Sequence, residues 1–348
     1  MADPRTIRVL EIDGGGARGI LPLHFLIKFI QLWGIDPADI WKYFDVITGT
    51  SVGGIMALGL AFGLTPAQLL PFFTDQGRYV FSLSSLVASL RPNEVVKVGL
   101  VLADTPFYQS SGITGDDYGH GLLYKTLEDT FKIAGVPATL QDLKTNVVIP
   151  AYERDTKHFV LFSNLNYAEF IGQNELISNV GLATSAAPAY LPAFTMNGHT
   201  YDDGGIFQNN PARFGFVLGR RIKPHANRCC VLSLGTGIGK VGFDTGMPDD
   251  PPTPPPPGAT TIETLFGLFE VAATGGQESV DRGLQIESYP YSLTQIYRYR
   301  FQPALDPLKN TELDNTDTDI FEYYEDLATE VFNNDISNIN TFLGHLTL

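Results

Sequence analysis

The sequence predicts an α/β fold with parallel strands, and three short stretches carry that prediction. In each, an apolar run typical of a buried strand ends in a glycine-containing turn, at 7–12, 44–47 and 229–234. The first two turns lead into apolar stretches long enough for helices, at 20–32 and 55–62. Because turns of this kind open at the carboxyl edge of a parallel sheet, we expect them to lie together at that edge.

The stretch 43–62 has the pattern of a nucleophile elbow. Its turn reads Gly49-Thr50-Ser51-Val52-Gly53, and Gly54 follows at the start of the helix. Such a turn is tight and strained, and its glycines leave room for neighbouring backbone. It presents the serine hydroxyl beside the unpaired N–H groups of the helix. The alternative is a glycine-rich turn with an idle serine, but the flanking strand and helix favour Ser51 as a nucleophile.

A second glycine-rich loop, Asp13-Gly14-Gly15-Gly16-Ala17-Arg18-Gly19, follows the first strand. Its glycines match the G-x-G-x-x-G pattern of dinucleotide-binding loops. The next strand, however, runs into the serine turn and does not end in the acidic residue that holds a ribose. Consecutive N–H groups of such a loop also bind anions, and attack of Ser51 on a carbonyl would create an oxyanion. Arg18 either reinforces this positive site or forms a structural salt bridge.

A third motif, Thr200-Tyr201-Asp202-Asp203-Gly204-Gly205, places two carboxylates beside two glycines and predicts a turn. One of the two aspartates is a candidate base for Ser51, and the residues alone do not choose between them. The alternative base is a histidine in a Ser-His-Asp triad. Only His225 and His345 follow an acid in the chain order typical of α/β-hydrolases, and both lie in polar or loop-like sequence.

Composition excludes several classes of protein. Of the 348 residues 44% are hydrophobic, and the net charge of −15 argues against nucleic acid and against electrostatic recruitment to an anionic membrane. The two cysteines, Cys229 and Cys230, are adjacent, so they form neither a disulfide framework nor a zinc site by themselves. We expect no metal and no cofactor, and read the cysteines as reduced thiols in a core strand.

No signal peptide and no transmembrane run is recognisable. The expected location is therefore cytoplasmic or peripheral to a membrane, with export without a cleaved signal as an alternative. No internal repeat is found, and residues 1–348 are expected to form one domain. The dense apolar positions between 64 and 90 predict a core helix or a cap over a cleft. Further expected elements are helices at 122–133, 140–143, 179–187, 262–284 and 321–342, strands at 146–152, 157–163 and 296–301, and a proline-rich surface loop at 244–258.

Taken in order, four stretches resemble the patatin-like phospholipase family over at least residues 7–240. They are IDGGGARGI at 12–20, GTSVGG at 49–54, ATSAAPAYLPAF at 183–194 and DGGIFQNNP at 203–211. The resemblance implies a three-layer fold, with a mostly parallel central sheet, helices on both faces and the elbow after a central strand.

The resemblance also implies a site and an activity. Ser51 would be the nucleophile and Asp203, which begins the D-G-G motif with Gly204 and Gly205, its base. The glycines 14–16 would form the oxyanion hole with Arg18 at the family's basic position, and Gly19, Gly49 and Gly53 would complete the motifs. The implied activity is metal-free hydrolysis of fatty-acyl esters of phospholipids or related lipids, with transient contact to a membrane surface. Alternatives are an effector gated by a ligand or host factor and a non-catalytic lipid-binding protein.

Overall fold

The structure is a computed structural model that describes residues 4–74, 121–188, 193–238, 294–311 and 315–347, with isolated residues between these ranges. The expectations for the proline-rich loop 244–258 and for most of the apolar stretches 64–90 and 262–284 lie outside the described residues. Within the stretch that begins at residue 64, two short helices are described, α3 (Pro66–Leu69) and α4 (Pro71–Thr74).

The centre of the molecule is an eight-stranded sheet with the order β10-β9-β1-β2-β5-β8-β7, in which β6 pairs with the other edge of β5. The strands β10, β9, β1, β2 and β5 run parallel, whereas β6, β7 and β8 pair antiparallel. The bounds are β1 Thr6–Ile12, β2 Val46–Gly49, β5 Asn146–Glu153, β6 His158–Phe162, β7 Phe194–Met196, β8 His199–Asp203, β9 Arg228–Leu234 and β10 Gln295–Phe301.

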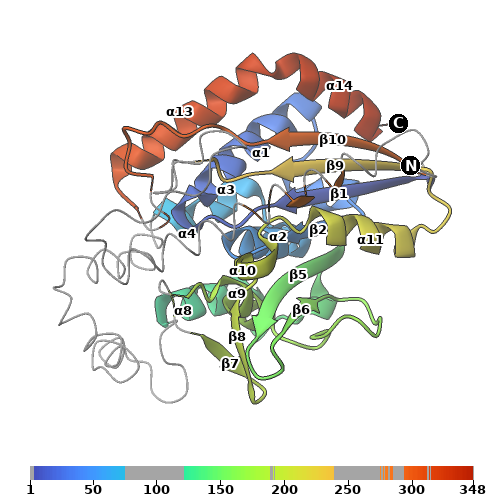
Figure 1. The fold of residues 1–348 in the computed structure, drawn as a ribbon, viewed down its shortest axis with the longest axis vertical. Helices are drawn as coiled ribbons and strands as arrows, with labels where there is room; N and C mark the ends of the chain where they lie inside the picture. Colours follow the sequence, from blue (N-terminus) through green and yellow to red (C-terminus); the bar gives the residue numbers. More distant parts are fainter. Residues whose placement is uncertain are drawn as a thin grey trace.

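Helices cover both faces of this sheet (Figure 1). One face carries α1 (Ile20–Trp33), α2 (Val52–Phe62) and α9 (Ile177–Ser185), with α8 (Gly121–Thr130) packed on α9 and α13 (Thr318–Asn334) packed on α1. The opposite face carries α11 (Ala212–Ile222). Helix α14 (Ile336–Thr347) packs against the outer strand β10 on the same face as α1, in the same core. The predicted three-layer, mostly parallel architecture is confirmed, and β2 with its elbow lies in the middle of the sheet.

The alternation of β1 explains why helices lie on both faces. Leu10 and Ile12 belong to the large core beneath α1 and α2, whereas Ile7 and Val9 belong to a second core beneath α11. Successive side chains of a strand point to opposite faces, so a strand that is buried at every position and has apolar residues on both faces needs cover on both. The buried free thiols Cys229 and Cys230 divide between the two cores in the same way, as expected for a core strand.

Three predicted elements differ from the structure. The helix expected over 122–133 ends at Thr130, because Lys132–Ile133 form β3 and turn back onto β4 (Val136–Pro137). The single helix expected over 321–342 is two helices, α13 and α14, which meet at Asp335. Asp202 and Asp203, expected in a turn, end strand β8, and α10 (Gly205–Gln208) follows them.

Helix α11 was not predicted, although Phe214, Leu218 and Ile222 recur at the spacing of one helix face. The remaining expected elements are present within one to three residues of their predicted bounds. They include a short 3-10 helix, Leu140–Asp142 before β5, while two others, Gly16–Gly19 after β1 and Pro37–Tyr43, were not predicted.

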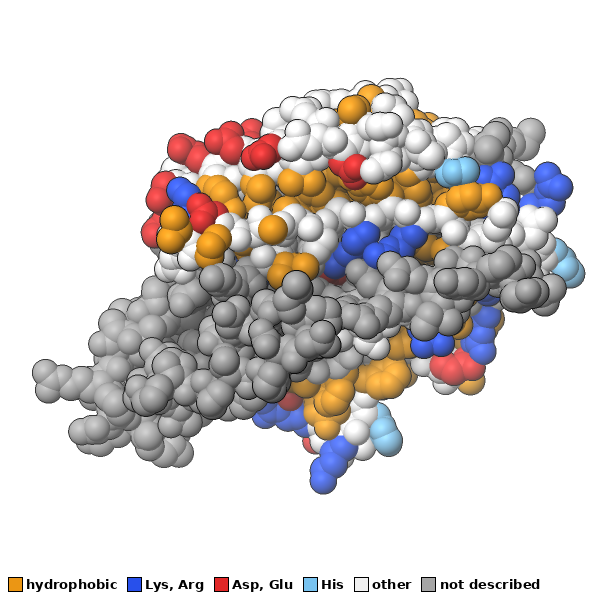
Figure 2. Space-filling model, turned by 45° about the horizontal axis from the view of Figure 1, so that its top comes forward, with side chains coloured by type: hydrophobic (Ala, Val, Ile, Leu, Met, Phe, Trp, Pro, Cys, Tyr) orange, Lys and Arg blue, Asp and Glu red, His pale blue; other side chains and the backbone are white. Residues whose placement is uncertain are grey.

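Figure 2 shows the face that lies at the top of Figure 1, with acidic side chains gathered at one end. Helix α13, at this end, contains five acidic residues and no lysine or arginine. In the part of the chain that the structure describes, no helix is both long enough and apolar enough to cross a bilayer.

Candidate active site

The turn between β2 and α2 has the backbone of a strained elbow. Ser51 has φ 58°, in the left-handed region that non-glycine residues rarely occupy. A Cβ at Gly49 would meet the carbonyl of Gly53, and a Cβ at Gly53 would meet the carbonyls of Ile12 and Asp13. Only glycine permits these close approaches, so the two glycines let β2, α2 and the end of β1 converge at Ser51.

Strand β5 determines what stands opposite Ser51. Its first half pairs in parallel with β2, where Thr48 is opposite Val148, and its second half pairs with β8, where Asp203 is opposite Ala151. Counting three residues on from Thr48 and Val148 places Ser51 at the level of Ala151 as well. The carboxyl ends of β2 and β8 therefore meet on one edge of β5, and Ser51 and Asp203 lie side by side.

Asp203 is fully buried, and burial raises the pKa of its carboxyl group to about 7. The Ser51 hydroxyl and the N–H of Gly205 favour the ionised form and oppose this rise. The Gly205 N–H donates to Asp203 Oδ1 at 2.6 Å, while Asp203 Oδ2 has no partner within hydrogen-bonding geometry among the described residues. The serine and the carboxylate thus face each other without a closed hydrogen bond, which is common in catalytic pairs before substrate binds.

Asp202 has a different partner. Arg154 donates two hydrogen bonds to its carboxylate, from Nε to Oδ2 at 2.5 Å and from Nη2 to Oδ1 at 2.6 Å. Asp202 is only 5% exposed, so its carboxylate is a buried ion-pair partner. Because neighbouring residues of a strand point to opposite faces, Asp202 and Asp203 cannot both face Ser51.

The glycine loop after β1 lies against the elbow. A Cβ at Gly14 would be 3.0 Å from the Cβ of Ser51. The N–H of Gly14 is engaged, since it donates to the carbonyl of Asn209 at 3.3 Å. The N–H groups of Gly15 and Gly16 donate to no described residue, which leaves these two as the candidate oxyanion donors of the loop.

Arg18 is held by the segment that precedes α13. Its Nε donates to the carbonyl of Thr311 at 2.5 Å, and the neighbouring Ala17 N–H donates to the carbonyl of Leu313 at 2.7 Å. The contact is structural but is made to a backbone carbonyl and not to the carboxylate of a salt bridge. It ties the far end of the loop to a residue 293 positions later and leaves the predicted role of Arg18 at the oxyanion site a prediction.

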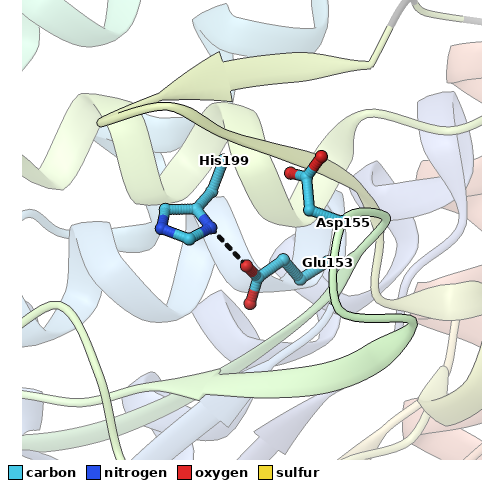
Figure 3. Close-up of side chains that lie close together, drawn as sticks. All are labelled: Glu153, Asp155 and His199. Carbon is cyan, nitrogen blue, oxygen red and sulfur yellow. Dashed lines mark ion pairs between the residues drawn. The ribbon is translucent and has the colours of Figure 1, made fainter.

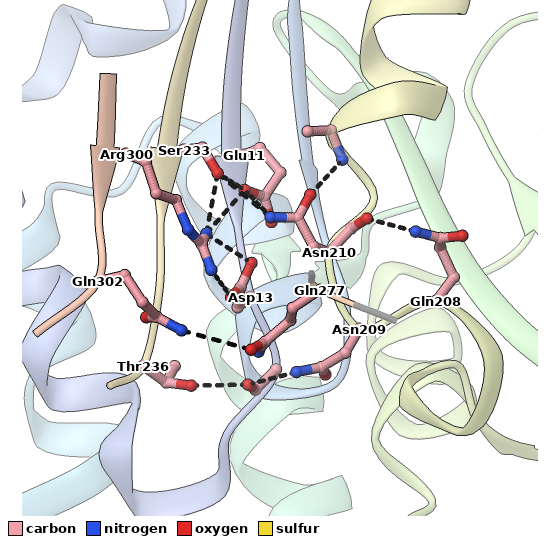
Figure 4. Close-up of polar contacts among 12 residues, drawn as sticks. Glu11, Asp13, Gln208, Asn209, Asn210, Ser233, Thr236, Gln277, Arg300 and Gln302 are labelled. Atoms are coloured by element: carbon pink, nitrogen blue, oxygen red, sulfur yellow. Dashed lines mark hydrogen bonds and ion pairs between the residues drawn. The ribbon is translucent and has the colours of Figure 1, made fainter. Parts of the chain in front are cut away.

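A buried polar cluster beneath the glycine loop was not recognised in the sequence (Figure 4). Arg300, on β10, binds both oxygens of Asp13 at 3.0 and 2.5 Å and also donates to Ser233 at 2.9 Å. Glu11 lies 3.6 Å from Arg300 and accepts hydrogen bonds from Ser233 and Asn210 on its Oε2. The only signal in the sequence was the alternation of arginines with aromatic residues in the strand 296–301.

Burial, together with the nearby Asp13 carboxylate, raises the pKa of Glu11 well above its usual range. The shift favours the protonated form of Glu11, in which the added hydrogen can be donated to Asp13. The central contact of the cluster is the ion pair between Arg300 and Asp13, directly before the glycine loop.

Neither histidine considered for a triad lies near Ser51. His225 is exposed in the segment before β9. His345 stacks on Tyr297 with the ring centres 3.9 Å apart, and its carbonyl accepts a hydrogen bond from Arg228, the first residue of β9. Both are thus at the amino end of β9, whereas Ser51 follows the carboxyl end of β2, so the two histidine alternatives are wrong.

One group of side chains has the composition of a metal site (Figure 3). The ligand atoms of Glu153, Asp155 and His199 lie within 4.8 Å of one another. His199 Nδ1 lies 2.5 Å from Glu153 Oε1, an oxygen with no hydrogen bond of good geometry among the described residues, and Asp155 accepts from the N–H of Thr200 at 2.7 Å. We therefore describe this group as an ion pair that joins the β5–β6 turn to the start of β8.

The chain belongs to the patatin-like phospholipase family, whose family model matches residues 10–215. This range contains both glycine-rich turns, the elbow serine and the D-G-G motif with the strands that carry them. The resemblance noted in the sequence is confirmed.

Two bacterial relatives are named cGAMP-activated phospholipase. The protein from Vibrio cholerae is 34% identical over 217 residues, which are 60% of this chain and 56% of the relative. The protein from Pseudomonas aeruginosa is 31% identical over 286 residues, 80% of this chain and 75% of the relative. The chain thus spans little more than half the length of the Vibrio protein. Patatin-like protein 2 from Arabidopsis thaliana is 30% identical over 66% of this chain and 60% of that protein.

Solved structures with a related fold are more distant in sequence. Human GIVD cytosolic phospholipase A2 aligns with 99% of this chain and 61% of its own at 11% identity and a TM-score of 0.45. VipD from Legionella pneumophila aligns with 94% of this chain and 68% of its own at 14% identity and a TM-score of 0.40.

The cluster beneath the loop generates a prediction about stability. Arg300→Gln leaves the buried carboxylate of Asp13 without its cation, so the free energy of unfolding should fall by about 3–5 kcal/mol. Glu11→Gln is the matched control, because the amide has nearly the same shape, can still accept from Ser233 and Asn210, and leaves the pair between Arg300 and Asp13 in place. Urea denaturation at pH 7 measures both variants, and an equal loss in the two would contradict the assignment of charge to Asp13.

Proposed function

We propose that the chain is a lipid acyl hydrolase of the phospholipase A type, with Ser51 as nucleophile and Asp203 as its base. The observation that carries the proposal is the placement of a buried carboxylate beside a strained elbow serine by the shared register of β5. Membership of the patatin-like phospholipase family supports lipid esters as the substrate class.

The proposed reaction begins when the Ser51 hydroxyl attacks the ester carbonyl and Asp203 accepts its proton. The N–H groups of Gly15 and Gly16 hold the negative charge that develops on the carbonyl oxygen. The acyl group remains on Ser51 as the lysolipid or alcohol leaves with a proton from Asp203. Water then attacks the acyl-serine with Asp203 again as the base, and a free fatty acid is released.

The raised pKa of Asp203 supports its role. A carboxylate with an ordinary pKa of about 3.9 is a weak base for a serine hydroxyl. The buried Asp203, with a pKa of about 7, binds a proton more readily while half of it remains ionised near neutral pH. A catalytic base is most useful when its pKa is near the working pH, and burial supplies that match here.

A hydrophobic contact with the lipid is the proposed mode of membrane association. Phe207 on α10, four residues after Asp203, is 54% exposed and packs against Tyr152 with the ring centres 4.8 Å apart. With a net charge of −15 the chain gains little from anionic headgroups, so an apolar rim near the site is the better-suited contact.

A second proposal concerns control of the activity. The bacterial relatives from Vibrio and Pseudomonas are named as cGAMP-activated, and the latter matches 80% of this chain. We propose that hydrolysis by this chain is likewise raised by a cyclic dinucleotide. This is a specific form of the ligand-gated alternative, and it requires no change in the roles of Ser51 and Asp203.

The first prediction of this proposal concerns the nucleophile. Ser51→Ala should remove hydrolysis of para-nitrophenyl butyrate and of mixed phospholipids while the melting temperature stays close to that of the wild type, because alanine keeps the Cβ and the same backbone. A fluorophosphonate probe should label the wild type at Ser51, as read by peptide mass spectrometry. The buried Ser163 serves as control, and Ser163→Ala should retain both labelling and turnover.

Turnover that survives Ser51→Ala would overturn the assignment of Ser51 as the nucleophile. A wild type without labelling or turnover, with or without cGAMP, would favour a lipid-binding protein.

The second prediction separates the two aspartates. Asp203→Asn should lower kcat about as far as Ser51→Ala does, because the two groups act as a unit, whereas Asp202→Asn should lose only a small part of the activity. In the wild type kcat/KM should fall as the pH drops through about 7, since protonated Asp203 cannot accept a proton. A similar loss in both variants, or an unchanged rate down to pH 5, would argue against Asp203 as the base.

The same carboxylate should reduce the stability of the fold. Its folded-state pKa lies above the unfolded value, so the folded state becomes less favourable as the pH rises from about 4 through about 7. The melting temperature of Asp203→Asn relative to the wild type should therefore be higher at pH 8 than at pH 4.

The third prediction concerns cGAMP. Its addition to the purified chain should raise phospholipid hydrolysis at least about fivefold, the lower range of coupling between linked sites. Isothermal titration calorimetry on Ser51→Ala measures binding without turnover. High hydrolysis without cGAMP, combined with no heat of binding, would reject this form of control and leave the hydrolase proposal standing.

A further inference from the structure

The carbonyl of Gly14 is held by two buried side chains from different parts of the chain. Thr236, after β9, donates from Oγ1 to this oxygen at 2.8 Å, and Asn209, after α10, donates from Nδ2 at 3.1 Å (Figure 4). The side chains are almost inaccessible, with Thr236 2% and Asn209 5% exposed. Both lone pairs of the carbonyl oxygen are thereby used, which fixes the direction of this C=O bond.

The direction of the Gly14 carbonyl also sets the direction of the Gly15 N–H. The Gly14 carbonyl and the Gly15 N–H belong to one planar trans peptide, so the N–H points opposite to the C=O. It therefore points away from Thr236 and Asn209, and it donates to no described residue. The preceding peptide is held as well, since the Gly14 N–H donates to the backbone carbonyl of Asn209 at 3.3 Å.

We propose that Thr236 and Asn209 are positioning residues that lock the Gly14–Gly15 peptide, so that the Gly15 N–H faces the oxyanion formed at Ser51. This inference rests on the proposed function and deepens it. Gly14 lies beside Ser51, because a Cβ on Gly14 would be 3.0 Å from that of Ser51. A donor whose direction is set before the reaction needs no reorganisation as charge develops.

The segment after Asp203 also forms a hydrogen bond with the serine turn. Thr50, the residue before Ser51, donates from Oγ1 to the carbonyl of Gln208 at 2.7 Å. Gln208 and Asn209 are adjacent, so one short segment holds the serine turn on one side and the glycine loop on the other. The base, the nucleophile and the oxyanion donor are thereby coupled through residues 203–209.

Thr236 is a cleaner test of this lock than Gly15 itself. A Cβ on Gly15 would collide with the Thr236 side chain, so a substitution there moves the loop and the threonine together. Thr236→Val instead keeps the branched shape and removes the hydroxyl, while Thr236→Ser keeps the hydroxyl. Thr145→Val is the matched control, because the Thr145 hydroxyl donates to the carbonyl of Phe44 at 2.9 Å at the opposite edge of the sheet.

The experiment measures kcat and KM with para-nitrophenyl butyrate, the rate of fluorophosphonate labelling and the melting temperature of each variant. Thr236→Val should lower kcat and the labelling rate about a hundredfold with KM nearly unchanged. The Gly15 N–H would stabilise the transition state and not the bound substrate, so its misalignment lowers the rate and not the binding. Thr236→Ser should restore most of both rates, and Thr145→Val should keep them even if its melting temperature falls equally. Equal losses in Thr236→Val and Thr145→Val, or a Thr236→Ser variant as slow as Thr236→Val, would overturn the proposal.

A second readout does not depend on turnover. Hydrogen exchange by mass spectrometry over a peptide spanning 12–20 should accelerate in Thr236→Val relative to the wild type and to Thr236→Ser, while a peptide from β5 stays unchanged. If the wild type neither hydrolyses esters nor reacts with the probe, the proposed function fails but the lock is still measured in this way. Unchanged exchange over 12–20 would then reject it.

Discussion

The site depends on the two-part pairing of β5. One edge of this strand is parallel to β2 along its first half and antiparallel to β8 along its second half. Two strands of opposite direction therefore end against each other, with Ser51 and Asp203 at the same level. A one-residue slip of β8 would turn Asp203 to the other face and bring Asp202 or Gly204 to its place. The antiparallel extension of a mostly parallel sheet is thus what allows a serine and an aspartate to meet without a histidine.

The groups around this meeting point are unfavourable for folding when taken singly. Ser51 has a strained backbone, Asp203 is buried with one oxygen unpaired, and burial beside Asp13 raises the pKa of Glu11. Such features persist where the surrounding structure over-determines them. Here the surroundings are the pair between Asp13 and Arg300 below the loop and the large apolar cores on either face of the sheet.

Four segments that are distant from it in the sequence support the glycine loop. Arg300 holds the aspartate that precedes it, Thr236 and Asn209 hold its first carbonyl, and the backbone of Leu313 holds its far end. The second half of the chain is thereby part of the site, although it contributes few of the recognisable motifs. A ligand that shifted any of these segments would act on the oxyanion donors, which offers a physical route for the proposed control by a cyclic dinucleotide.

The sequence by itself determined the parts of the site that depend on local pattern. The elbow, the glycine loop and most of the strands follow from apolar runs, turn glycines and their order along the chain, and these patterns hold whatever the fold does elsewhere. Tertiary structure decided the rest. Contacts between distant segments account for the division of 321–342 into two helices, for the supporting roles of Thr236, Asn209 and Arg300, and for the partner of Arg18.

The two neighbouring aspartates are the clearest case of a feature that depends on tertiary structure. The motif comparison favoured Asp203, but the residues alone could not, because only the register of β8 on β5 turns one carboxylate toward Ser51 and the other toward Arg154.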